Sequence, residues 1–130
     1  MHKKKGSIYL VDSDSSALRG LTRLLRAGGY EVLAYTSSEE LLKSFIADKN
    51  ACLITDARTL SLSKNELRAE LSKKAVKLPV IFVSTDDDEK TRKKARTFNA
   101  AGFFRKPVDG PALLDAIAWA LETAGQPNEH

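Results

Sequence analysis

The sequence predicts an α/β protein in which one parallel sheet is wound with helices. Short apolar runs alternate along the chain with longer segments of helical periodicity, which is the pattern of βα units around a parallel sheet. The chain has 130 residues, of which 42% are hydrophobic and 29% charged, and this fits one domain with a real core. No internal repeat and no long linker interrupts the alternation. These three observations predict a single α/β domain.

Five βα units can be placed along the chain in order. The expected strands cover residues 7–12, 30–35, 51–55, 80–83 and 102–105. The expected helices cover residues 15–27, 64–74, 88–98 and 110–123, and one more begins at Ser37-Ser38. Crossovers between parallel strands are right-handed almost without exception. This order therefore predicts a five-stranded, doubly wound (βα)5 sheet of the flavodoxin-like type.

In the first half of the chain, turn and cap residues mark the helix ends. Gly28-Gly29 stops the first helix, and Ser37 begins a cap that leads into the second. Apolar residues at helical spacing indicate the inward faces of both helices. These residues are Leu18, Leu21, Leu24 and Leu25 in the first helix, and Leu41, Leu42 and Phe45 in the second.

In the second half, the helices carry weaker apolar patterns. The third helix has only Leu67 and Leu71 as strong anchors. Pro79 opens the fourth strand, and the helix after it is mostly charged, so we expect it to bury only a thin stripe. Pro111 suits the first turn of the last helix, because proline fits that position well.

Composition indicates where the domain begins and ends, which partners it lacks and in which compartment it lies. We expect a flexible basic leader over residues 1–6, the domain over 7–124 and a polar tail over 125–130. The net charge is +4, but basic residues are not interleaved with stacking aromatics, so no direct nucleic-acid binding is expected. No apolar run approaches the roughly 20 residues of a membrane span, so no membrane association is expected. The single Cys52 cannot form an internal disulfide, which fits a reducing cytoplasm.

Four small polar residues follow or close separate apolar runs. They are Asp12, Asp56, Ser84 and Lys106. Because ligands bind at the carboxyl ends of strands in such sheets, we expect these side chains to converge on one pocket. Two carboxylates, one hydroxyl and one ammonium suit a divalent cation and a phosphoryl group. His2 and His130 are terminal and lack metal-ligand partners, so the sequence does not support a zinc site.

Two segments carry a resemblance to a known family. Residues Val80–Thr85, followed by Asp87–Glu89, are similar to the fourth strand and the start of the fourth helix in that family. Residues Gly102–Pro107 are similar to its fifth strand with a lysine-proline signature. Asn99 stands where the family often has glycine, which fits because Asn tolerates the left-handed conformation. Over residues 7–124 the chain resembles the receiver domain of bacterial two-component response regulators, in particular those that precede a helix-turn-helix domain.

The resemblance implies a phosphorylation site. Asp56 would accept a phosphoryl group from a sensor histidine kinase or a phosphotransfer protein. Asp12, Asp56 and the backbone carbonyl of Arg58 would hold Mg²⁺. Lys106 would pair with the phosphoryl oxygens, and Ser84 would donate a hydrogen bond to one of them. The chain would then act as a signal-transduction module and not as an enzyme.

The resemblance also implies a conformational switch. On phosphorylation the Ser84 hydroxyl would move and the aromatic ring of Phe103 would turn inward behind it. The change would spread over the fourth helix, fifth strand and fifth helix, the usual partner face of the family.

Several residues depart from the family pattern. Ser13 stands where the family has a second acidic residue, and a hydroxyl binds a hard cation more weakly than a carboxylate. Mg²⁺ affinity should therefore fall unless another group compensates. Thr59-Leu60 replaces a methionine-proline pair, Lys64 replaces a glycine, and Thr85 replaces a small residue beside the phosphoryl site. These departures leave open a phosphorylation-independent pseudo-receiver that acts as a protein-interaction domain.

An enzyme is the third reading of the same residues. Asp12-Ser13-Asp14 after an apolar strand also looks like the nucleophile motif of haloacid-dehalogenase-type phosphatases, with Asp12 as nucleophile and Asp14 as general acid/base. Asp86 and Asp87 precede the lysine, whereas the final acidic pair of that motif set should follow it. Asp14 can instead cap the following helix or lean toward the metal.

Trp119 lies on the last helix, nearly opposite a stripe expected to be buried. The stripe consists of Leu114, Ile117 and Leu121. An exposed Trp on that face predicts an interface for a homodimer or for an output domain.

Overall fold

Five strands and five helices alternate along the chain. The strands are β1 (Ser7–Val11), β2 (Glu31–Tyr35), β3 (Ala51–Asp56), β4 (Val80–Ser84) and β5 (Gly102–Arg105). The helices are α1 (Ser15–Ala27), α2 (Ser38–Ser44), α3 (Lys64–Lys73), α4 (Glu89–Thr97) and α5 (Gly110–Ala124). The predicted bounds that fall on described residues are met to within one residue. This computed structural model describes residues 5–44, 50–61, 63–73 and 78–124.

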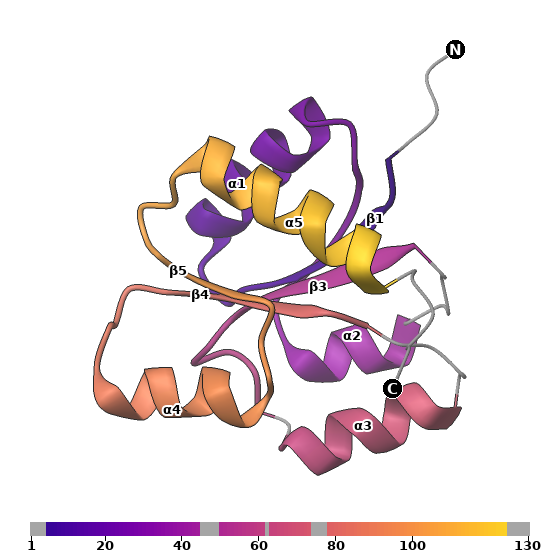
Figure 1. The fold of residues 1–130 in the computed structure, drawn as a ribbon, viewed down its shortest axis with the longest axis vertical. Coiled ribbons are helices and arrows are strands. Elements are labelled where there is room, and N and C mark those ends of the chain that lie inside the picture. The colour runs from indigo at the N-terminus through magenta and orange to yellow at the C-terminus, as the bar shows by residue number, and fades with distance from the viewer. Residues whose placement is uncertain (1–4, 45–49, 62, 74–77, 125–130) are drawn as a thin grey trace.

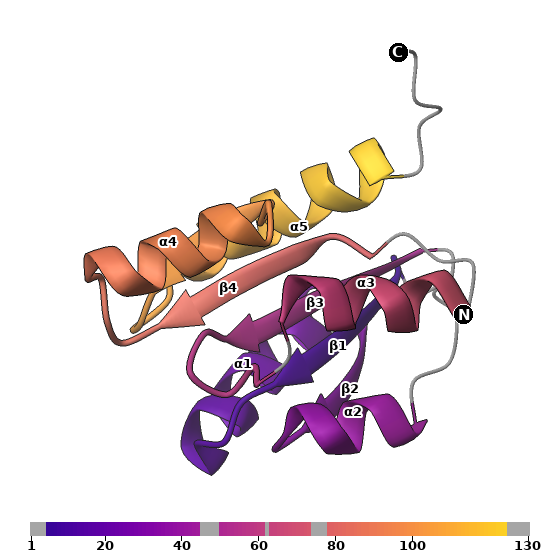
Figure 2. The same ribbon diagram turned by 90° about the horizontal axis from the view of Figure 1, so that it is seen from below.

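The strands form one parallel sheet between two layers of helices. Their order is β2-β1-β3-β4-β5, and every neighbouring pair is parallel. Helices α1 and α5 cover one face, and α2, α3 and α4 cover the other (Figure 1). Figure 2 shows the second layer of helices in front of the sheet. The predicted doubly wound, flavodoxin-like sheet is therefore confirmed.

Two apolar clusters fix the helices on the sheet. Alternate residues of a strand point to opposite faces, so Ile8 and Leu10 pack toward α1 and α5 while Tyr9 and Val11 pack toward α2, α3 and α4. Both faces of β3 and β4 are buried in the same way. In α4 the buried stripe is as thin as predicted, since Ala95 is its buried residue.

Local cap chemistry sets the helix ends. The carboxylate of Asp14 accepts hydrogen bonds from the amides of Ser16 and Ala17, which makes it the N-cap of α1. Helix α1 ends at Gly28, and Gly29 has a φ of 99°, which glycine adopts without a steric penalty. The expected left-handed residue after α4 is confirmed, because Asn99 has a φ of 53°.

The predicted buried stripe of α5 needs a correction. The buried residues of this helix are Leu113, Ile117 and Ala120. The predicted Leu114 and Leu121 are half-buried at the edge of that stripe, since the small Ala120 lets the helix approach the sheet on the other side. Trp119 still lies opposite, with 60% of its surface exposed.

Some predictions fall outside the described residues. These are the leader over residues 1–4, the inward face of Phe45, the helix end at residue 74 and the tail over 125–130; the side chain of Leu71 is not described either. Within the described part of the chain, no helix has both the length and the apolar character needed to cross a bilayer.

Candidate functional site

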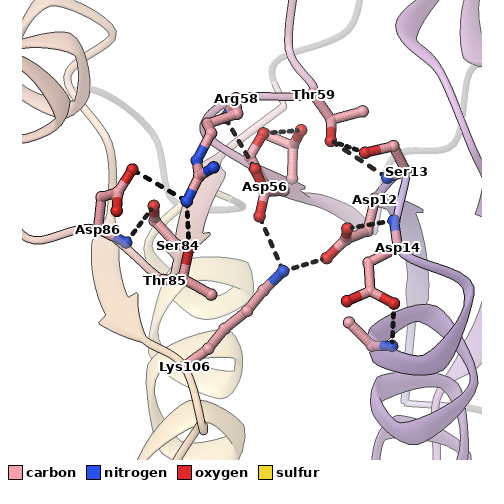
Figure 3. Close-up of polar contacts among 12 residues, drawn as sticks. Asp12, Ser13, Asp14, Asp56, Arg58, Thr59, Ser84, Thr85, Asp86 and Lys106 are labelled. Carbon is pink, nitrogen blue, oxygen red and sulfur yellow. Dashed lines mark hydrogen bonds and ion pairs between the residues drawn. The ribbon is translucent and has the colours of Figure 1, made fainter.

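Three charged side chains meet at the carboxyl edge of the sheet. Asp12 directly follows β1, Asp56 is the last residue of β3, and Lys106 directly follows β5. The Lys106 Nζ lies 2.6 Å from Asp12 Oδ2 and 2.8 Å from Asp56 Oδ2 (Figure 3). The two carboxylates are nearly buried, with Asp12 1% and Asp56 7% exposed. Asp12, Asp56 and Lys106 therefore meet in one pocket, as predicted.

Backbone amides hold the other oxygen of each carboxylate. Asp12 Oδ1 accepts from the Asp14 amide at 2.9 Å, and Asp56 Oδ1 accepts from the Arg58 amide at 2.8 Å. Each carboxylate is thus fixed in orientation by one amide and one ammonium. Charge-assisted hydrogen bonds of this kind are among the stronger ones in proteins.

The ammonium of Lys106 is stabilised by the carboxylates that it bridges. Burial disfavours its charged form, but the hydrogen bonds and charges of Asp12 and Asp56 outweigh this, so the pKa of Lys106 is raised. The ammonium therefore stays charged over the whole physiological range and neutralises part of the acidic pocket.

Ser84 reaches the same edge but is engaged elsewhere. It closes β4 and is fully buried, and its hydroxyl accepts a hydrogen bond from the Asp86 amide at 3.0 Å. The hydrogen bonds found among the described residues do not join it to Asp56. The hydroxyl hydrogen is left for another acceptor beside the acidic pair.

Arg58 contributes its backbone to the pocket and its side chain to the neighbouring loop. Its guanidinium lies 3.0 Å from Asp86 Oδ2 and is hydrogen-bonded to the hydroxyl of Thr85 (Figure 3). Both ends of the ion pair are solvent-exposed, so its contribution to stability is small. It nevertheless joins the loops that follow β3 and β4 across the mouth of the pocket.

Phe103 is half-buried on β5, on the face covered by α4. It packs at the edge of the apolar cluster beneath α2, α3 and α4. The guanidinium carbon of Arg92, on α4, lies 5.6 Å from the centre of the Phe103 ring. The same arginine is paired with Asp87, at the start of α4.

Two residues that depart from the family pattern contact each other. Thr59 Oγ1 accepts from the Ser13 amide at 3.1 Å and lies 3.2 Å from the Ser13 hydroxyl oxygen. The two residues are 46 positions apart in the sequence, so nothing in the sequence alone links them. The pair joins the loop after β1 to the loop after β3.

Two further residues hold the loop after β3, and sequence reasoning missed both. Ser38, buried at the start of α2, donates to the Thr59 carbonyl at 3.3 Å and accepts from the Ser61 amide at 3.2 Å. Lys94, on α4, donates to two backbone carbonyls of the loop. No local signal distinguishes Lys94 from the adjacent Lys93, since only the tertiary structure gives it these acceptors.

The remaining predicted residues lie apart from the pocket. The carboxylate of Asp14 caps α1, which is one of the two roles that the sequence left open for it. Trp119 lies on the exposed face of α5.

The donor set of the pocket fits Mg²⁺ in part. Within the described residues, no group of three or more acidic, histidine or cysteine side chains is arranged so that it could hold a metal ion. Mg²⁺ keeps several waters and commonly uses only one or two carboxylates together with a phosphate group, which Asp12 and Asp56 can satisfy.

The fold and the acidic pocket define a phosphoacceptor module of signal transduction. The chain belongs to the response regulator receiver domain family, whose model matches residues 8–118. Receiver domains are generally signalling modules without enzymatic activity that bind Mg²⁺ at their acidic pocket. They interact with histidine kinases or phosphotransfer partners and can dimerise.

Curated relatives and solved structures agree with this assignment. Nodulation protein W of Bradyrhizobium diazoefficiens is 35% identical over 118 residues, which are 91% of this chain and 52% of that protein. Response regulator protein TmoT of Ectopseudomonas mendocina is 32% identical over 130 residues, all of this chain and 59% of that protein. The chain therefore spans little more than half the length of these relatives.

Among solved structures, a response regulator receiver protein from Burkholderia phymatum has a TM-score of 0.71 and 31% identity, covering 91% of this chain and 96% of that one. Full-length FixJ from B. japonicum shares the fold, with a TM-score of 0.79 at 24% identity over 94% of this chain and 60% of that one.

Proposed function

We propose that Asp56 is the residue that accepts the phosphoryl group. The observation that carries this assignment is the bridge of Lys106 Nζ to Asp56 Oδ2 and Asp12 Oδ2, at 2.8 and 2.6 Å. It places a permanent cation beside a carboxylate at the edge of the sheet where ligands bind. Asp12 lies on the far side of that cation, and Asp14 is occupied by the helix cap.

In the transfer step, a carboxylate oxygen of Asp56 attacks the phosphorus of a phosphohistidine in a partner kinase or phosphotransfer protein. An O–P bond forms, the P–N bond breaks, and its electron pair returns to the imidazole nitrogen of the partner. The product is an acyl phosphate on Asp56 that stores the signal. Lys106 pairs with the transferred oxygens, and the free hydroxyl hydrogen of Ser84 is donated to one of them.

Asp12, Asp56 and the backbone carbonyl of Arg58 are the groups that would hold Mg²⁺. When bound, the cation neutralises charge on the phosphoryl oxygens and orients them for in-line transfer. The hydroxyl of Ser13 would contribute less than a carboxylate at the same position, so we expect weak binding.

The signal is read on the face formed by α4, β5 and α5. Movement of Ser84 toward the phosphoryl group draws the β4–α4 loop with it, because the Ser84 hydroxyl also holds the Asp86 amide. Phe103 lies next to α4 and follows that loop. Trp119 extends the face on α5, where a second copy of the chain or an output domain docks. Loss of that docking in Trp119→Ala tests the interface, and unchanged oligomeric state and partner affinity would contradict it.

We also propose that the protein is located in the cytoplasm. Cys52 is a buried free thiol, as is usual in a reducing compartment.

The test is a titration with Mg²⁺ followed by beryllofluoride, which mimics the acyl phosphate, with backbone amide NMR as the readout. We expect saturable shifts around Asp56 that extend to Ser84, Phe103 and α4, and that are absent in Asp56→Asn. No metal binding and no shifts at millimolar Mg²⁺ would overturn the proposal in favour of the phosphorylation-independent interaction domain.

A further inference from the structure

Lys94 makes an unusual contact between α4 and the loop that follows Asp56. Its Nζ lies 2.6 Å from the Ala57 carbonyl oxygen and 2.6 Å from the Leu60 carbonyl oxygen. An ammonium has three donors, so two of them are used on one turn of backbone. These two carbonyls flank Arg58 and Thr59, and they face a helix that lies 34 to 37 residues further along the chain.

The backbone of this loop has little stiffness of its own. Residues 57–61 contain neither proline nor glycine. The amides of Thr59 and Leu60 donate to the Asp56 carbonyl at 3.1 and 3.2 Å. Other contacts come from Ser13, in the loop after β1, from Ser38 on α2, and from the neighbouring strand ends. The contacts from Lys94 to the Ala57 and Leu60 carbonyls are made by a charged donor, and hydrogen bonds to charged groups are the stronger ones.

The ammonium of Lys94 also responds to the acceptor carboxylate. Burial lowers the pKa of Lys94, the charge of Asp56 opposes that effect, and the neighbouring Lys90 adds to it. Negative charge at Asp56 therefore favours the charged form of Lys94, which is the form that donates to both carbonyls. Two residues earlier on α4, Arg92 lies over the ring of Phe103, so the same helix contacts both the acceptor loop and the aromatic residue.

We propose that Lys94 is a positioning residue that fastens the loop after Asp56 to α4, so that a change at Asp56 is passed to α4 directly through the loop backbone. The part of this inference that concerns signalling rests on the proposed function. The fastening itself is a property of the unmodified protein and can be measured without any phosphoryl group.

The first experiment compares amide hydrogen exchange of Thr59 and Leu60 in the unmodified full chain. The variants are Lys94→Met, its exposed neighbour Lys93→Met as matched control, and Lys94→Arg as the conservative replacement. We expect exchange to become about tenfold faster in Lys94→Met, because a charge-assisted contact is lost. Lys93→Met should match the wild type, and Lys94→Arg should recover part of the protection. Equal exchange in Lys94→Met and Lys93→Met would overturn the proposal.

The second experiment adds Mg²⁺ and beryllofluoride and follows the amide shifts of Asp56, Phe103 and α4. In Lys94→Met we expect the shifts around Asp56 to persist while those of α4 fall to less than half of their wild-type size. Full α4 shifts in this variant would overturn transmission through Lys94. A wild type that does not respond at all would refute the proposed function instead, and the exchange comparison would still decide the fastening.

Discussion

Ser13 changes the charge of the acceptor pocket, and its contact with Thr59 joins the two loops beside it. The pocket holds two carboxylates and one ammonium, which leaves one net negative charge to attract a cation. The hydroxyl of Thr59 binds the amide of Ser13 and thereby holds the two loops at the separation found here. Serine at residue 13 thus makes the pocket less negative than the acidic residue of the family would. The contact with Thr59 preserves the shape of the pocket.

A carboxylate at residue 13 should restore cation affinity. We expect Ser13→Asp to tighten Mg²⁺ binding by about tenfold, since an added unit charge about 4 Å from another is worth between about 1 kcal/mol in water and about 4 kcal/mol near a protein surface. Calorimetric or NMR titration with Mg²⁺ measures the change. Ser13→Asn is the matched control, because it adds similar bulk without the charge. Equal affinity in the two variants would show that charge at residue 13 is not what limits binding.

The residues of the pocket differ in how far they could be predicted. Asp12, Asp56 and Lys106 were predictable, because strand order and parallel direction alone bring strand ends together. The roles of Ser38 and Lys94 were not, because each depends on which carbonyl of a distant loop faces the helix. A serine at a helix start and a lysine in a charged helix have many equivalents in the sequence.

Among the elements, α1 depends on a residue that stands next to the pocket. Asp14 caps this helix through the amides of Ser16 and Ala17. We expect Asp14→Ala to lower the free energy of unfolding by about 1 kcal/mol while Mg²⁺ affinity stays within about twofold. Urea denaturation and metal titration of one sample measure both. Asp14→Asn should keep the stability, since Asn caps equally well. A large loss of metal affinity in Asp14→Asn would instead assign Asp14 to the cation site.

The elements themselves were predictable to within a residue, because Gly29, Asn99 and Pro111 mark helix ends by backbone geometry. The rotation of α5 about its own axis, which decides which of its residues face the sheet, was not predictable. Leu114 and Leu121 are more apolar than Ala120, yet Ala120 is the residue that faces the sheet, because a small side chain permits close approach. The hydrophobicity of a side chain favours its burial, but close packing of a helix on a sheet also requires a side chain of the right size.

At the scale of the whole molecule, the buried thiol of Cys52 makes the free energy of unfolding fall as the solution becomes alkaline. This residue lies in the core between β3 and the α1/α5 layer, and burial raises the pKa of its thiol from 9.0 to about 12. The unfolded chain therefore loses this proton first, and stability falls as pH rises from about 9 toward 12. The contribution of this group is about 1.4 kcal/mol for each pH unit within that window.

Cys52→Ala should remove that dependence. We expect the variant to be less stable at neutral pH because of the cavity, but to lose stability less steeply between pH 9 and pH 11. Urea denaturation of both proteins at several pH values gives the two slopes. Parallel slopes would contradict the burial of the thiol.

The late position of Lys106 in the sequence matters while the chain is being synthesised from its N-terminus. The ammonium that joins the two acidic strand ends is separated from Asp12 by 94 residues and from Asp56 by 50. A polypeptide that has emerged only as far as β4 already contains both carboxylates, but it lacks the cation that holds them together. The pocket therefore gains its cation only after the chain has been made through Lys106, when β5 can pair with β4 at the edge of the sheet.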